Sequence, residues 1–204
     1  MPLPRVKFCG FTRNEDVVAA VDLGIDAIGL NLARGPRKIS VEQASVLVRS
    51  IPPLVVAVAL FVDADEASIL AAMQATRCTV VQLHGTEPPE LAERLRRRFP
   101  VIKAFAVRDA ASLVAVQNYP ADAYLLDAAV VGQAGGTGSS WDHQLIEGLH
   151  FDRPWLLAGG LRPENAAAAA ATGAWALDVS SGIESAPGCK DPGRMAAFMA
   201  ALRG

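Results

Sequence analysis

Residues 154–184 have the sequence PWLLAGGLRPENAAAAAATGAWALDVSSGIE, which contains one complete repeat of the pattern that decides the fold. A short apolar run is followed by a glycine-rich loop, a strong helix former, a second apolar run and another glycine-rich loop. Working outward to the N-terminus, the same alternation predicts eight strands: RVKFC (5–9), DAIGLNL (26–32), VVAVALFV (55–62), TVVQLH (79–84), PVIKAF (100–105), AYLLD (123–127), PWLLA (154–158) and WALDVS (175–180).

This alternation is typical of a parallel α/β sheet, because each strand is separated from the next by enough residues for a crossover helix. The chain has 204 residues, which is near the lower limit for an eight-stranded barrel. We therefore expect a single (β/α)8 TIM barrel that occupies residues 1–204 as one catalytic domain. An open, doubly wound sheet would need a glycine-rich fingerprint after the first strand, and CGFTRNED (9–16) is not one.

Helix-start signals lie between the predicted strands. Thr12 to Glu15 and Ser40 to Gln43 have the spacing of a capping box. Pro163 suits a first helical turn, and the alanine run 166–171 predicts a helix.

Composition limits the class of partner. The formal net charge is -2, so nothing indicates a nucleic acid or an acidic membrane surface. No apolar stretch is long enough to span a bilayer, and the first strand starts too early for a signal peptide. The three cysteines and three histidines lack metal-ligand spacing. We expect a reduced, metal-free, cytoplasmic protein with a small-molecule partner.

Polar residues interrupt several of the predicted strands, although a strand covered on both faces should be continuously apolar. Side chains alternate between faces, so three pairs should each share a face: Lys7 with Cys9, Gln82 with His84, and Lys103 with Phe105. An interior ion pair, such as Lys7 with Asp178, is one explanation. For the set as a whole, we predict a polar mouth at the top of the barrel.

The glycine-rich segments AGGLRPEN (158–165) and DVSSGIE (178–184) follow the last two predicted strands. Glycine lets backbone N–H groups approach an anion, and loops seven and eight of such barrels commonly bind phosphate. We therefore predict a phosphorylated substrate, held at these five residues: Gly159, Gly160, Ser180, Ser181 and Gly182.

The segment 128–140, AAVVGQAGGTGSS, is long for a loop between a strand and a helix. Loops of this kind often act as lids over a site, and the candidate lid residues are Gly135, Gly136, Thr137 and Gly138. Asp127 closes the preceding strand, where its carboxylate is well placed to face a ligand.

Eight motifs together resemble phosphoribosylanthranilate isomerase of tryptophan biosynthesis: KFCGFT, GPRKIS, ALFVD, VQLHG, LLDA, GGTGSSWD, LAGGLRPEN and DVSSGIESAPGCKD. The resemblance covers the whole chain. It implies a barrel without a metal or organic cofactor, and neighbouring tryptophan-pathway enzymes as partners. It also implies an Amadori rearrangement of N-(5-phosphoribosyl)anthranilate to 1-(2-carboxyphenylamino)-1-deoxyribulose 5-phosphate.

The same resemblance implies roles for individual residues. Cys9 is the general base and Asp127 the general acid, and Arg37 meets the anthranilate carboxylate. We also expect His84 and Asp178 to bind substrate. Ring opening needs a protonated acid, whereas removal of the C2′ proton needs an ionised base.

The chain departs from the family pattern around Arg37. Family members often have an aromatic residue in the second strand and Ser-Pro-Arg after it, whereas this chain has Asn31, Leu32 and Gly35 in GLNLARGPR. Ser139 stands in the lid where a basic residue is frequent. Two alternatives stay open: the related aminoimidazole ribotide isomerase of the histidine pathway, and a barrel that binds a sugar phosphate without catalysis.

Overall fold

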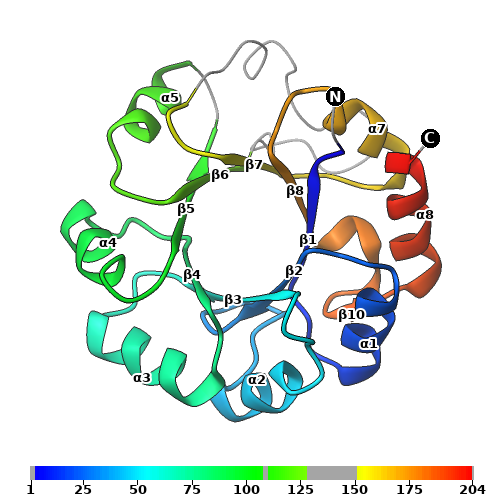
Figure 1. Ribbon diagram of the computed structural model, residues 1–204, viewed down its shortest axis with the longest axis horizontal. Helices are drawn as coiled ribbons and strands as arrows, with labels where there is room; N and C mark the ends of the chain where they lie inside the picture. The colour runs from blue at the N-terminus through cyan, green and yellow to red at the C-terminus, as the bar shows by residue number, and fades with distance from the viewer. Residues whose placement is uncertain (1–2, 108–109, 128–150, 204) are drawn as a thin grey trace.

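A closed barrel of eight parallel strands forms the centre of the molecule, and helices surround it (Figure 1). The computed structural model describes residues 3–107, 110–127 and 151–203. The strands are β1 (Arg5–Cys9), β2 (Ala27–Asn31), β3 (Val56–Phe61), β4 (Val80–Leu83), β5 (Val101–Ala106), β6 (Ala123–Asp127), β7 (Trp155–Ala158) and β8 (Ala176–Val179). The predicted TIM barrel is confirmed, and each predicted strand is found to within one residue at either end.

The helices lie outside the strands and cross back between them. They are α1 (Asn14–Asp22), α2 (Val41–Val48), α3 (Glu66–Thr76), α4 (Pro89–Leu95), α5 (Ala110–Gln117), α7 (Ala166–Ala170) and α8 (Pro192–Arg203). Two 3-10 turns, η1 (Pro163–Asn165) and η2 (Ser181–Ile183), and a small hairpin of β9 (Glu184–Ala186) and β10 (Cys189–Lys190) follow the last two strands. In the part of the chain that the structure describes, no helix is long and apolar enough to cross a membrane.

Local helix-start signals are confirmed at two positions and wrong at a third. Ser40 and Gln43 form the predicted capping box at the start of α2, and Pro163 opens η1. Helix α1 instead begins after Arg13, which makes no side-chain capping bond. The hydroxyl of Thr12 donates to the carbonyl oxygen of Gly188 at 2.6 Å, so a contact with the β9–β10 hairpin replaces the cap.

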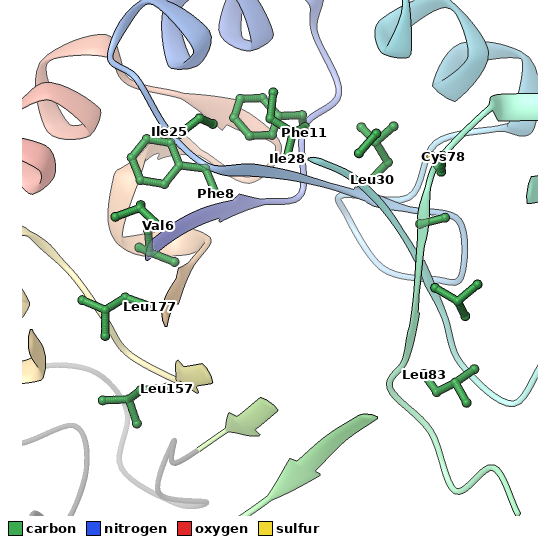
Figure 2. Close-up of a cluster of buried hydrophobic side chains, with 14 of the residues drawn as sticks. Val6, Phe8, Phe11, Ile25, Ile28, Leu30, Cys78, Leu83, Leu157 and Leu177 are labelled. Atoms are coloured by element: carbon green, nitrogen blue, oxygen red, sulfur yellow. The ribbon is translucent and has the colours of Figure 1, made fainter. Parts of the chain in front are cut away.

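The main apolar core lies between the barrel and the helices. Phe8 of β1 is fully buried there, and its ring packs edge-on against Phe198 of α8 with 6.0 Å between centroids. Figure 2 shows part of this core, with Val6 and Phe8 of β1 beside Ile28 of β2. A second, smaller cluster fills the lumen with the inward side chains of β5 to β8: Ala104, Leu125, Leu156, Ala158 and Ala176.

The two clusters show which side chains of β5 point into the lumen and which point toward the helices, and they correct one prediction. Because Ala104 belongs to the lumen cluster, its neighbours Lys103 and Phe105 point outward. Phe105 packs against the outer core, and the Lys103 ammonium lies 5.6 Å from the ring centroids of Phe105 and Tyr119. Lys103 and Phe105 therefore do not line the mouth of the barrel.

Candidate active site

The C-terminal ends of the strands surround a cavity of about 400 Å³. Nine of the site residues predicted from the sequence line it: Cys9, Arg37, His84, Asp127, Gly159, Gly160, Asp178, Ser180 and Ser181. Gln82 lines it as well and Lys7 does not, so the polar mouth is confirmed for Gln82 and His84 of β4 and for Cys9 of β1. Strand ends at one rim of the barrel thus bring together residues that are far apart in the sequence.

A buried charge cluster lies at one wall of this cavity. Lys7 is opposite Asp178 in the register of β1 and β8, and its ammonium is 2.7 Å from an Asp178 carboxylate oxygen. Burial lowers the pKa of Lys7, but the charge of Asp178 and the Cys9 thiolate raise it by more. The interior ion pair considered from the sequence is confirmed, and the Lys7 ammonium lies in the same cluster as the Cys9 thiol.

Cys9 is a buried thiol at the end of β1. Burial raises its pKa, and the positive charges of Lys7 and Lys190 oppose that effect without cancelling it. Gly29 on β2 is paired with Cys9, and a Cβ placed there would lie 2.6 Å from the Cys9 sulfur. The absence of a side chain at Gly29 therefore leaves room for the thiol.

The opposite side of the cavity holds a carboxylate and an imidazole. His84 Nε2 lies 3.9 Å from an Asp127 carboxylate oxygen. The Gln82 amide nitrogen is 3.0 Å from His84 Nδ1. Burial lowers the pKa of His84 although Asp127 opposes it, so the imidazole is neutral near pH 7. With Gln82 donating to Nδ1, the ring proton is on Nε2 and faces Asp127.

Gln82 is a further candidate that the sequence reasoning did not assign to binding. It is fully buried, lines the cavity, and its side-chain oxygen has no hydrogen-bond partner among the described residues. Its place beside His84 on one face of β4 was the signal available in the sequence.

The loops after β7 and β8 meet at the rim of the cavity. Gly159 and Gly160 both have positive φ, at 92° and 61°, which turns their backbone at the rim. Gly182 does not line the cavity. A Cβ at Gly182 would collide with the carbonyl of Leu161, so this glycine allows the two loops to pack together.

Arg37 reaches the cavity across the end of β1. A Cβ at Gly10 would lie 2.5 Å from Arg37 Cδ, and Gly10 also has a φ of 84°. The Arg37 guanidinium holds both oxygens of Glu184, through Nε at 2.8 Å and NH2 at 2.6 Å. Sequence reasoning did not assign this partner, although Glu184 lies in the DVSSGIE motif.

The departures from the family pattern shape the β2–α2 loop. The Asn31 side chain accepts from the Ala33 N–H and donates to the Arg34 carbonyl, each at 2.9 Å. Gly35 has a φ of 90°, which favours glycine. The resulting turn brings Arg34 to the cavity wall, a position that the sequence did not indicate.

The candidate lid residues Gly135, Gly136, Thr137, Gly138 and Ser139 lie outside the described residues. Within the described ranges, no cluster of three or more metal-ligating side chains occurs.

Comparison with known proteins identifies relatives over the whole length of the chain. The model of the N-(5'phosphoribosyl)anthranilate (PRA) isomerase family matches residues 6–201. The N-(5'-phosphoribosyl)anthranilate isomerase of Cereibacter sphaeroides is 45% identical, over 98% of both chains. That of Moorella thermoacetica is 43% identical, over 98% of this chain and 89% of its own.

Solved structures agree with these matches. Phosphoribosyl anthranilate isomerase from Thermotoga maritima superposes with a TM-score of 0.92 at 36% identity, covering 99% of this chain and 100% of its own. The enzyme from Thermus thermophilus gives a TM-score of 0.86 at 40% identity, covering 98% of each chain. A third structure, at 33% identity with a TM-score of 0.86, is a complex with reduced 1-(o-carboxyphenylamino)-1-deoxyribulose 5-phosphate and covers 99% of this chain and 100% of its own.

Proposed function

This chain belongs to the N-(5'-phosphoribosyl)anthranilate isomerase family of tryptophan biosynthesis, and we propose that it uses Cys9 as general base and Asp127 as general acid. Its reaction is the Amadori rearrangement of the aminoaldose phosphate to the 1-deoxyribulose phosphate. The histidine-pathway isomerase and the non-catalytic barrel are not favoured by these matches.

The observation that carries this assignment is that one cavity holds both residues, on different strands. The reaction needs a proton on the furanose oxygen, which opens the ring to a Schiff base. It then needs a base that removes the C2′ proton to give an enolamine, and this tautomerises to the ketone. Because the carboxyl group and the thiol lie on separate strands, the first can protonate the furanose oxygen and the second can remove the C2′ proton.

Lys7 supports the role of Cys9 as base. A thiol must ionise before it can take a proton, and burial raises the Cys9 pKa against this. The Lys7 ammonium stabilises the thiolate, while Asp178 holds that ammonium in place at 2.7 Å.

Neutral His84 supports the role of Asp127 as acid. His84 Nε2 lies 3.9 Å from the Asp127 carboxyl group, so the neutral imidazole places a polar N–H beside it without adding a full positive charge. We also propose that His84 and Asp178 hydrogen-bond the substrate, and that Arg37 binds the anthranilate carboxylate with N–H groups that Glu184 does not use.

We propose that backbone N–H groups at Gly159, Gly160, Ser180, Ser181 and Gly182 bind the substrate phosphate. The first four residues line the cavity rim, and Gly182 lies in the packed junction of the same two loops. A structure with phosphate or sulfate bound elsewhere in the barrel would contradict this assignment.

The remaining proposals concern the chain as a whole. We propose one catalytic domain over residues 1–204, a lid formed by the residues after Asp127, and a cytoplasmic location, which suits three cysteines outside any disulfide. Neighbouring enzymes of the tryptophan pathway are the protein partners that we propose.

The two roles are tested by following loss of the fluorescence of the anthranilate riboside phosphate during turnover. Asp127→Asn removes the transferable proton, so kcat should fall by about 10² to 10⁴-fold. Cys9→Ser should lose proton abstraction while substrate binding survives. A Cys9→Ser enzyme with near wild-type kcat would remove Cys9 from the mechanism.

A further inference from the structure

We propose that Glu184 and Lys190 are positioning residues for Arg37, and that together they set the preference of the site for a substrate with a carboxylate on its aromatic ring. This inference rests on the proposed contact between Arg37 and that carboxylate.

Glu184 fixes the orientation of the Arg37 guanidinium. The carboxylate is 4% exposed and takes the Nε and NH2 groups of Arg37 as a bidentate pair, at 2.8 and 2.6 Å. A guanidinium has five N–H groups, so this pair leaves three for another anion. Because the pair fixes a planar group, those three N–H groups lie in a fixed plane at the cavity wall.

Orientation alone would come with an electrostatic disadvantage. A carboxylate that pairs with Arg37 also neutralises its charge and repels a second carboxylate brought to the same guanidinium. The cavity would then offer donors to the substrate without a net attraction.

Lys190 removes this disadvantage. Its side chain is fully buried, and its ammonium lies 2.8 Å from the Glu184 oxygen that Arg37 Nε also contacts. Two cations and one carboxylate leave one net positive charge in the cluster. The pKa of Glu184 is lowered because Arg37 and Lys190 together outweigh the effect of its burial, so the carboxylate stays ionised.

The remaining contacts of Lys190 tie this cluster to the rest of the site. Its ammonium also donates to the carbonyl oxygens of Cys9, at 2.5 Å, and Ser180, at 3.2 Å. All three ammonium N–H groups therefore have an acceptor, and these acceptors belong to the base, the phosphate loop and the Arg37 partner. A lysine that served only the hairpin β9–β10 would not need these three partners.

The test compares two substrates in each variant. The first is N-(5-phosphoribosyl)anthranilate, and the second is the aniline analogue, which lacks only the ring carboxylate. Proton NMR follows the conversion of both substrates. The ratio of their kcat/KM values isolates the carboxylate contact, because any change in Cys9 affects both substrates. Lys190→Met should lower this ratio by about tenfold, since it leaves Arg37 neutralised by Glu184.

Lys103→Met is the matched control. Lys103 is equally buried and also pairs with a buried glutamate, Glu87, at 2.8 Å, but it lies outside the barrel lumen. Its loss should leave the ratio unchanged. A wild-type ratio in Lys190→Met, or an equal fall in both variants, would overturn the inference.

The double variant Glu184→Gln/Lys190→Met removes both buried charges, so it also guards against a single variant that does not fold. It restores the net charge of Arg37 but loses its orientation, and its ratio should lie between those of Lys190→Met and the wild type. A wild-type ratio in the double variant would overturn the positioning role of Glu184, and a ratio as low as in Lys190→Met would overturn the charge-balancing role of Lys190. Failure of the wild type to turn over the first substrate would instead overturn the proposed function.

Discussion

Strands β1 and β5 carry the same local pattern with different outcomes. Each has a buried lysine two residues before another residue on the same face: Lys7 before Cys9, and Lys103 before Phe105. Each lysine pairs with a carboxylate, at 2.7 and 2.8 Å. Lys7 pairs with Asp178, which lines the reaction cavity, whereas Lys103 lies among aromatic rings on the outer face of the barrel. A buried ion pair is therefore no indication of catalysis until the face of its strand is known.

The environments of the two lysines explain how both charges are tolerated. Glu87 accepts hydrogen bonds from the backbone N–H groups of Asp63 and Gly85 as well as from Lys103. That pair therefore fixes the loops after β3 and β4. Asp178 instead borders the cavity, where it can reach a substrate.

The largest effect that we expect on this comparison is a loss of stability in Lys103→Met. The variant leaves Glu87, only 1% exposed, as an uncompensated buried charge, which typically costs about 3–5 kcal/mol. Urea unfolding measures the free energy. For the folded variant, kcat/KM should stay within about threefold of the wild-type value. A large loss of kcat/KM at unchanged stability would instead show that β5 belongs to the catalytic machinery.

The next largest effect is expected from a substitution on β2 that changes the lumen face of β1 without replacing any residue of β1. In Gly29→Ala the new methyl group would displace the Cys9 thiol, because the added Cβ would lie 2.6 Å from the sulfur. A displacement of about 1 Å at a reacting group can cost roughly 10²-fold in rate, so we expect kcat to fall by about that factor. Turnover at saturating substrate checks this, with circular dichroism to confirm the fold; an unchanged kcat would argue against Cys9 as the base.

The smallest effect is expected in Lys7→Met, the counterpart of Lys103→Met. Its cost in stability should be smaller, because Asp178 borders a cavity and its charge can be hydrated there. Loss of the ammonium should raise the Cys9 pKa further and lower kcat/KM near pH 7.5 by about 10- to 100-fold. Equal stability losses in the two lysine variants, with equal activity, would remove the distinction between the two strands.

The sequence predicted much of this molecule because the signals were local or periodic. Alternating apolar runs located the strands, and residues at strand ends, such as Cys9, His84 and Asp127, necessarily met at one rim. The alternation of side chains along a strand shows which residues share a face, but it does not show which face points into the barrel. For this reason Lys103 was wrongly assigned to the mouth of the barrel.

Other features depend on partners that are known only after folding. The Thr12 hydroxyl could have capped α1, but it donates instead to the carbonyl oxygen of Gly188, in a hairpin that is far away in the sequence. The sequence assigned Gly182 to a phosphate loop, but it did not indicate that the carbonyl of Leu161 leaves no room for a side chain at this position. Lys190 lies in a two-residue strand without periodicity, so nothing local indicated that it would contact Cys9 and Glu184.

The most direct test of the central claim is the pH dependence of kcat/KM for the wild type, Cys9→Asp and Cys9→Ser. If Cys9 is the base, activity rises with pH as the thiolate forms. Burial raises the Cys9 pKa, so the rising limb should lie above the usual thiol value of about 8.5. Cys9→Asp should move that limb to lower pH and stay more active than Cys9→Ser. A limb that stays at the same pH in Cys9→Asp would contradict the account.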